Sequence, residues 1–215
     1  PSSPYATESK LIRDLNTATS RLRHHLEGLD VPMFVTTPDL RADVDAEWLP
    51  VVIDTETWES LRPAFELERP VVLHMPTNGL LKGSEYVDEV LFGLRDEGLV
   101  EYLRPTDPLR PGEVAALIER SDIVIDGIVL GAYGVMSCQT MAAGRIAIAN
   151  IRDVGTIRSA CPIVDADPST LDAVIRELVA EHESWPSIAD AGQRFVSQYH
   201  DGTYSSSQLA RFLGV

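Results

Sequence analysis

Apolar residues in the first quarter of the chain follow two patterns. Steps of three and four positions between leucines and alanines predict an amphipathic helix over Glu8–Leu29, with Thr7 or Ser9 as its N-terminal cap. Two short apolar runs bracketed by prolines follow, at Met33–Thr37 and Trp48–Ile53. These runs predict two short strands joined by a loop.

From Pro70 onward, buried-strand patterns alternate with amphipathic helical patterns. The expected strands are Val71–Leu73, Leu99–Leu103, Ile123–Asp126, Ile146–Asn150 and Pro162–Val164. The expected helices are Ser84–Glu97, Gly112–Arg120, Val135–Ala143, Ser187–Tyr199 and Ser205–Leu213, with one more that Asp167 caps and Pro168 opens. Each right-handed crossover places its helix against the sheet, so this alternation predicts a doubly wound α/β domain with a parallel sheet.

The charge balance narrows the classes of partner. The 215 residues are 44% hydrophobic and 24% charged, which suits one large domain or one domain with an appendage. Because 33 Asp and Glu against 18 Lys and Arg give a net charge of -15, a nucleic acid or an anionic membrane surface would be repelled. No apolar stretch approaches the roughly 20 residues that cross a bilayer, and no signal-peptide pattern opens the chain, so a cytoplasmic protein is expected.

The cysteines and histidines do not predict a metal centre. Cys138 and Cys161 are the only cysteines, too few for a disulfide scaffold or a thiolate zinc site. His24 and His25 are adjacent on a predicted helix and therefore diverge. No metal site is expected from these residues.

Three loops carry the candidate chemistry, because ligands of a doubly wound sheet bind outside the carboxyl ends of its strands. The loop after the first strand of the sheet contains Lys82, one of only two lysines, just before a helix start. The loop after Ile123–Asp126 brings glycines to the start of the next helix, where free backbone N–H groups favour a phosphate. A rigid, basic loop that begins at Arg104 is a weaker candidate, as the border of a nucleotide base.

Each of these features also has a purely structural interpretation. Lys82 by itself suits a solvated surface lysine, and His74 suits a hydrogen-bonded histidine at a strand end better than a catalytic base. Asp126 either caps the loop or contacts a ligand. The glycines form neither a dinucleotide-binding nor a Walker fingerprint, so spacing alone leaves the phosphate site open.

Four segments match one family pattern. They are Val71–Asn78 with Lys82–Ser84, Ser121–Asp126, Gly131–Ala149, and Phe34–Leu40 with Glu47–Asp54. Together they resemble the donor-binding C-terminal half of GT-B glycosyltransferases, the retaining, nucleotide-sugar-dependent type of cell-wall and polysaccharide synthesis. The resemblance implies a Rossmann-like nucleotide-sugar-binding domain over residues 55–215. Residues 1–54 would be the tail of the acceptor-side domain and the hinge.

The resemblance implies how a donor diphosphate would be held. Lys82 would neutralise it, and N–H groups at Gly134, Val135 and Met136 would hold its oxygens, stabilising the charge that grows on the leaving group. Since lysine and helix N–H groups would supply this charge stabilisation, the resemblance implies a nucleoside-diphosphate sugar as co-substrate and no metal or other cofactor.

The family's two donor-contacting glutamates correspond to Gly131 and Gln139 in this chain. Gln139 would still hydrogen-bond a ribose hydroxyl, whereas Gly131 offers only backbone. The remaining expected donor-site residues are Tyr133, His74 and Arg104. Lys82 and Gln139 are the two expected to contribute to catalysis.

Three functions compete. The first is a glycosyltransferase component that binds the donor and needs a missing acceptor domain or partner chain, so that this chain alone would not turn over. The second is a catalytically silent GT-B relative that serves as a regulatory or assembly subunit. The third is a generic α/β binding module. A homo-oligomer stays open in all three.

Overall fold

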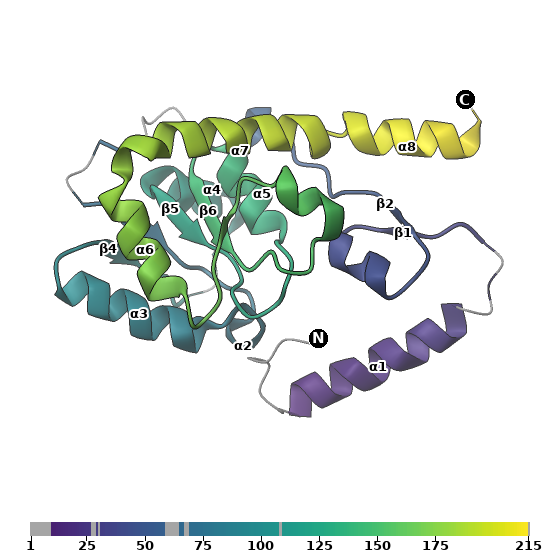
Figure 1. Cartoon of the computed structure of the whole chain (residues 1–215), viewed down its shortest axis with the longest axis horizontal. Helices are drawn as coiled ribbons and strands as arrows, with labels where there is room; N and C mark the ends of the chain where they lie inside the picture. Colours follow the sequence, from purple (N-terminus) through teal and green to yellow (C-terminus); the bar gives the residue numbers. More distant parts are fainter. Residues whose placement is uncertain are drawn as a thin grey trace.

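A five-stranded parallel sheet forms the centre of the computed structural model, which describes residues 10–26, 29, 31–58, 65–66, 69–107 and 109–214 (Figure 1). The strands are β3 (Val71–Leu73), β4 (Glu101–Leu103), β5 (Ile123–Ile125), β6 (Ile146–Ala149) and β7 (Val164–Asp165). Their order across the sheet is β4-β3-β5-β6-β7, and every neighbouring pair is parallel. The predicted parallel sheet is therefore confirmed.

Helices cover both faces of this sheet because strand side chains alternate between its two faces. On one face, Val72 and Ile123 pack against α3 (Ser84–Asp96) and α6 (Leu171–Ala180). On the other, Leu73 and Val124 pack against α4 (Pro111–Arg120), and the small residues of β6 pack against α5 (Val135–Ala142) and α7 (Trp185–Tyr199). This is the doubly wound arrangement that the alternation of elements predicts.

The segment before the sheet forms a second, smaller unit. It contains α1 (Lys10–Leu26), β1 (Phe34–Val35), η1 (Pro38–Ala42) and β2 (Glu47–Trp48), with β1 and β2 paired in parallel. Figure 1 shows α1 standing apart from the sheet domain, while α8 (Thr203–Leu213) extends from α7 toward β1 and β2. The predicted N-terminal helix and two short strands are present. The helix caps proposed at Thr7 and Ser9 lie outside the described residues, and the domain boundary after residue 54 stays a prediction.

The strand expected over Trp48–Ile53 is wrong beyond Trp48. The Leu49 amide still donates to the Val35 carbonyl oxygen of β1 over 2.9 Å, but residues 50–54 are in no strand and are held by His200, at the end of α7. The Ile53 amide donates to the His200 carbonyl oxygen over 2.7 Å, and the His200 ring donates from Nδ1 to the Val51 carbonyl oxygen over 2.9 Å. Ile53 is buried against the end of α7, so the apolar run mimics a strand.

The helix predicted to open at Pro168 begins at Leu171. Asp167 does cap backbone N–H groups, but it accepts from Ser169 over 2.8 Å within a turn that precedes the helix. Short elements that the pattern did not predict are α2 (Gly79–Lys82), η2 (Glu56–Trp58), η3 (Gly155–Ser159) and η4 (His182–Ser184). Each is at most five residues long, too short for a hydrophobic period to register.

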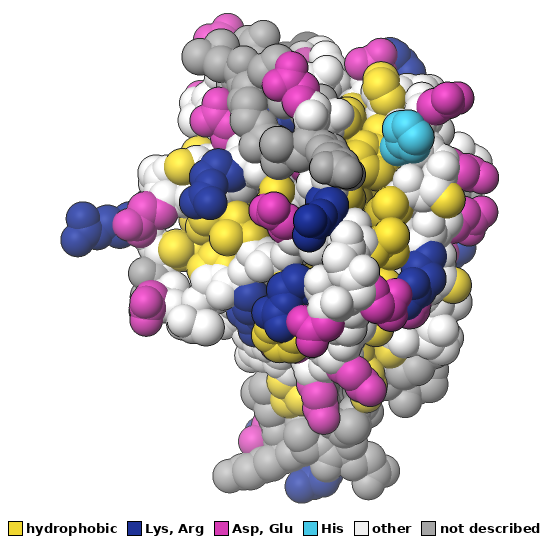
Figure 2. Space-filling model, turned by 90° about the vertical axis from the view of Figure 1, so that its left-hand side faces the viewer, with side chains coloured by type: hydrophobic (Ala, Val, Ile, Leu, Met, Phe, Trp, Pro, Cys, Tyr) yellow, Lys and Arg dark blue, Asp and Glu magenta, His cyan; other side chains and the backbone are white. Residues whose placement is uncertain are grey.

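Charges of both signs are interspersed on the side of the molecule that lies at the left in Figure 1. In Figure 2, which views that side, acidic side chains lie scattered among Lys and Arg, so the described residues form no continuous basic patch there. Within the described ranges, no helix combines the length and the apolar character that a membrane crossing requires.

Candidate functional site

A cavity of about 370 Å³ opens at the carboxyl ends of β3 and β5. After β3 the chain first adds β4 on one side of it and then crosses over to add β5 on the other side. The strand order therefore reverses between β3 and β5. In open α/β sheets, ligands bind at such a switch point. The lining residues are Trp58, Met75, Pro76, Thr77, Lys82, Val114, Ile125, Asp126, Val135, Met136 and Gln139.

Lys82 reaches this cavity from the end of the short helix α2, where that helix meets α3. Asn78 caps α2 by accepting the Leu81 amide over 3.2 Å, and Gly83 ends it in the left-handed conformation. The Lys82 carbonyl oxygen accepts the Ile128 amide over 3.2 Å, which ties α2 to the loop after β5. The Lys82 side chain then crosses Gly127, where an added Cβ would lie 3.0 Å from the lysine Cδ. The expectation of a purely solvated lysine is therefore wrong, since the side chain is only 26% exposed and ion-paired.

Asp126 lies at the centre of the polar contacts in this cavity. Its carboxylate forms an ion pair with Lys82 through Oδ1, and its side chain is only 2% exposed. Its other oxygen, Oδ2, accepts the Gly134 amide and the Ser137 hydroxyl, each over 2.9 Å. Asp126 thus caps the N-terminus of α5, one of the two roles that the sequence left open. The Gly134 amide, which the resemblance assigns to the donor diphosphate, is occupied by this carboxylate.

The other expected contacts of α5 face the cavity. Val135, Met136 and Gln139 all line it, and Val135 is 46% exposed. The amides of Val135 and Met136 lie in the first helical turn, where backbone N–H groups have no acceptor within the helix. These two N–H groups and the Gln139 side-chain amide can therefore donate to a ligand.

His74 is a buried structural histidine at the end of β3. Its Nδ1 donates to the Ile125 carbonyl oxygen over 2.9 Å, and its Nε2 accepts from the Ser84 hydroxyl over 2.9 Å. Burial lowers the pKa of His74 from 6.5 to about 4, so the ring is neutral near pH 7. Both ring nitrogens are engaged and the residue does not line the cavity, which agrees with the hydrogen-bonded interpretation.

This burial predicts how stability depends on pH. Between pH 6.5 and 4 the unfolded chain binds a proton at position 74 that the folded chain does not, so stability falls as the pH falls. We expect a loss of about 2 kcal/mol from this residue between pH 6.5 and 5. Urea unfolding at several pH values should show a correspondingly shallower slope for His74→Asn. The wild-type chain is the reference, because burial also lowers the pKa of His200 in both proteins. Equal slopes would contradict the assignment.

Three other expected donor-site residues do not line the cavity. Arg104 pairs with Asp88, Nε to Oδ1 over 2.8 Å. Tyr133 is 4% exposed, and its hydroxyl lies 3.2 Å from Nε2 of His200. Gly131 offers no room for a side chain, because an added Cβ would lie 2.0 Å from Oδ2 of Asp153.

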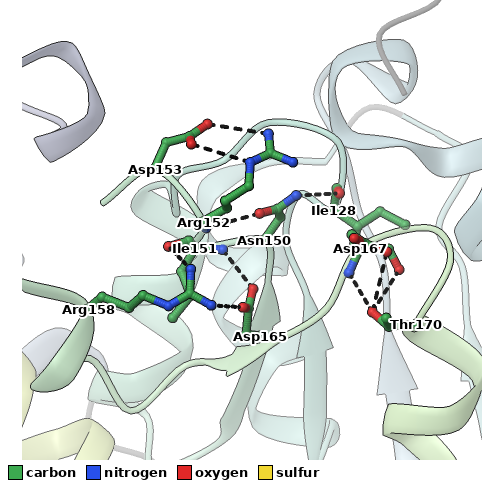
Figure 3. Close-up of polar contacts among 9 residues, drawn as sticks. All are labelled: Ile128, Asn150, Ile151, Arg152, Asp153, Arg158, Asp165, Asp167 and Thr170. Atoms are coloured by element: carbon green, nitrogen blue, oxygen red, sulfur yellow. Dashed lines mark hydrogen bonds and ion pairs between the residues drawn. The ribbon is translucent and has the colours of Figure 1, made fainter. Parts of the chain in front are cut away.

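The Gly131 loop is held by contacts with the loop after β6, which is itself tied to β7 (Figure 3). Asn150 donates from its side chain to the Ile128 carbonyl oxygen over 3.2 Å and accepts the Arg152 amide over 3.0 Å. Asp165 accepts the Ile151 amide over 3.0 Å and pairs with Arg158. Asp153 is fixed beside this network by the 2.7 Å bond from its amide to the Gly131 carbonyl oxygen.

Sequence reasoning missed Trp58 at the cavity and Ser137 beside Asp126. Trp58 lines it from η2, and no spacing signal marks that tryptophan. Ser137 binds Asp126 from the first turn of α5. The sequence signal for Ser137 was its place three residues after Gly134.

Comparison with known proteins identifies the fold. No protein-family model and no curated protein matches the chain. Among solved structures, sucrose-phosphate synthase from Thermosynechococcus elongatus is similar over 97% of this chain and 64% of its own, with 16% identity and a TM-score of 0.68. HepE from Anabaena, in complex with UDP and glucose, is similar over 92% of this chain and 67% of its own, with 13% identity and a TM-score of 0.68.

A third similar structure is an isolated C-terminal domain. The C-terminal domain of the group 1 glycosyl transferase LpcC from Francisella tularensis is covered over 97% of its length by 68% of this chain, with 13% identity and a TM-score of 0.52. The chain thus spans about two thirds of the longer relatives and nearly all of an isolated C-terminal domain. The chain therefore has the GT-B fold of these structures, one of which is an isolated C-terminal domain of a glycosyl transferase.

Proposed function

We propose that the chain is a component of a glycosyltransferase and binds a nucleoside-diphosphate sugar in the cavity beside Lys82. The observation that carries the proposal is the position of this cavity at the switch point of a GT-B sheet. A lysine, two helix N-terminal amides and the Gln139 amide converge on it. A lysine and helix N-terminal amides are groups that bind phosphate oxygens in proteins.

The solved relatives suggest which nucleotide to test. Structures of the Anabaena protein contain UDP-glucose in one case and UDP in another. The proposal extends this class of ligand to the present chain, with transfer to a polysaccharide or glycoconjugate acceptor in the cytoplasm.

An acceptor-side domain, on the same chain or a partner, would complete the enzyme. Apolar residues are exposed where such a domain would adjoin β1 and β2: Leu22 is 57% exposed on α1 and Phe212 is 50% exposed on α8. A cavity of about 600 Å³ beside Leu26 and Met33 opens on the same side. The proposal therefore includes a partner domain that covers these residues and supplies the acceptor site.

Calorimetric titration with UDP, GDP, ADP and dTDP tests donor binding. We expect one nucleotide to bind saturably, and Lys82→Ala to weaken that binding at least tenfold, about 1.4 kcal/mol, because the positive charge facing the phosphates is lost. Arg176→Ala is the matched control, since Arg176 pairs with Glu97 and Asp172 and does not line the cavity.

A second candidate function is that of a silent GT-B relative with a regulatory or assembly role. The observation that favours it is Gly131, whose side-chain space is occupied by Asp153, so that no side chain can reach a donor sugar from this position. Failure of a folded chain to bind any of the four nucleotides would support this second function against the first.

A further inference from the structure

The Asp126 carboxylate occupies a position where the surrounding hydrogen-bond donors would also suit a phosphate group. One ammonium group from Lys82, one backbone amide from Gly134 and one hydroxyl from Ser137 converge on its two carboxylate oxygens. Lysine, a helix N-terminal amide and a serine hydroxyl are also the donors that proteins direct at phosphate oxygens. In this chain the anion that these donors bind is the side chain of Asp126.

The cavity consequently carries no net positive charge. Lys82 and Asp126 are the charged side chains among the described residues that line it, and their charges cancel. The whole chain has a net charge of -15, so no general attraction offsets this neutrality. An added diphosphate meets a lysine that is already paired and a buried carboxylate of its own sign.

We infer that the Asp126 carboxylate competes with the phosphates of the donor for Lys82. It holds Lys82 and the Gly134 amide while the cavity is empty, and a bound diphosphate takes Lys82 from it. This competition lowers the affinity for the nucleoside diphosphate in proportion to the ligand's phosphate charge. It therefore favours release of the charged nucleoside-diphosphate product. The inference rests on the proposed donor site.

Removal of the Asp126 charge provides the test. Asp126→Asn keeps an oxygen that can accept from Gly134 and Ser137, and it frees Lys82 for the ligand. We expect UDP to bind Asp126→Asn at least tenfold more tightly than the wild-type chain in calorimetric titrations, with a steeper decline as salt is added. Uridine, which has no phosphate, should bind both proteins equally.

A matched variant separates the local charge from the total charge. Asp172→Asn removes the same unit of charge and also breaks an ion pair with an arginine, but Asp172 lies on α6 and does not line the cavity. UDP affinity should be unchanged in this variant. If Asp126→Asn does not fold, as judged by circular dichroism, Asp126→Ser removes the same charge and retains a hydroxyl oxygen.

The outcomes distinguish this inference from the proposed function. Saturable UDP binding to the wild-type chain that is unchanged or weaker in Asp126→Asn would overturn the inference alone and make Asp126 a positioning residue for Lys82. A gain of equal size for uridine and UDP would overturn it as well. No binding of UDP or of the other nucleotides by either folded protein would overturn both the inference and the donor site.

Discussion

Replacing Gly83 by valine is expected to destabilise the chain by about 4 kcal/mol. Gly83 joins α2 to α3 with a φ of 77°, a conformation that costs an L-residue energy and a β-branched residue most of all. An added Cβ would lie 2.7 Å from Cγ2 of Val129 and 2.9 Å from Cγ1 of Ile128. Both neighbours are at most 2% exposed, so they have no open space to move into. Urea unfolding gives the free energy directly.

The matched control is another glycine of the same segment. Gly93 lies within α3, and an added Cβ there meets no atom within 4 Å. Gly93→Val should change the free energy of unfolding by less than about 0.5 kcal/mol, because valine is a slightly better helix former than glycine. A loss below 1 kcal/mol for Gly83→Val would show that the α2–α3 junction is loosely packed. In that case Gly83 would not be what fixes Lys82 at the cavity.

The sheet and its helices could be predicted because burial on both faces leaves a direct trace in the sequence. A strand such as Val71–Leu73 is apolar throughout, and α3 repeats its apolar residues at helical spacing. The pattern was wrong beyond Trp48, where burial had another cause. The run after Trp48 is covered by His200 and the end of α7, a contact across about 150 residues that no local period reveals.

The location of the site could also be predicted, but the partners within it could not. Parallel strands bring their carboxyl ends to one edge, so Lys82 and the glycines before α5 were expected to meet there. The sequence does not specify which hydrogen-bond donor a carboxylate will take. Asp126 meets a lysine 44 positions earlier, and this pairing decides whether the Gly134 amide is open to a ligand.

Side-chain direction at the ends of strands explains the remaining differences. Whether His74 or Tyr133 points into the cavity or into the protein depends on the packing of neighbouring elements. His74 turns toward β5 and α3, and Tyr133 turns toward Phe195 of α7. No sequence motif fixes the direction of either side chain. A family pattern therefore predicts where such a residue lies in the fold more reliably than it predicts what its side chain contacts.

Replacing Lys82 by methionine is expected to cost about 3 kcal/mol of stability, because it leaves the Asp126 carboxylate buried without its cation. Methionine retains an unbranched side chain across Gly127, so packing there is largely kept. The opposite single change should cost less. In Asp126→Asn the unpaired Lys82 is 26% exposed and can turn to water, whereas the Asp126 side chain is 2% exposed, so a loss of about 1 kcal/mol is expected.

A double-mutant cycle isolates the energy of this ion pair. With Lys82→Met and Asp126→Asn combined, neither charge remains, and the double variant should lose only about 1 kcal/mol, well below the sum of the two single losses. The coupling energy would then be about 3 kcal/mol. Urea unfolding of the four proteins at pH 7 and at two salt concentrations measures it, and a buried pair should be weakly sensitive to salt. Additive losses would mean that Gly134 and Ser137 satisfy the Asp126 charge without Lys82, which would leave Lys82 available to an incoming phosphate.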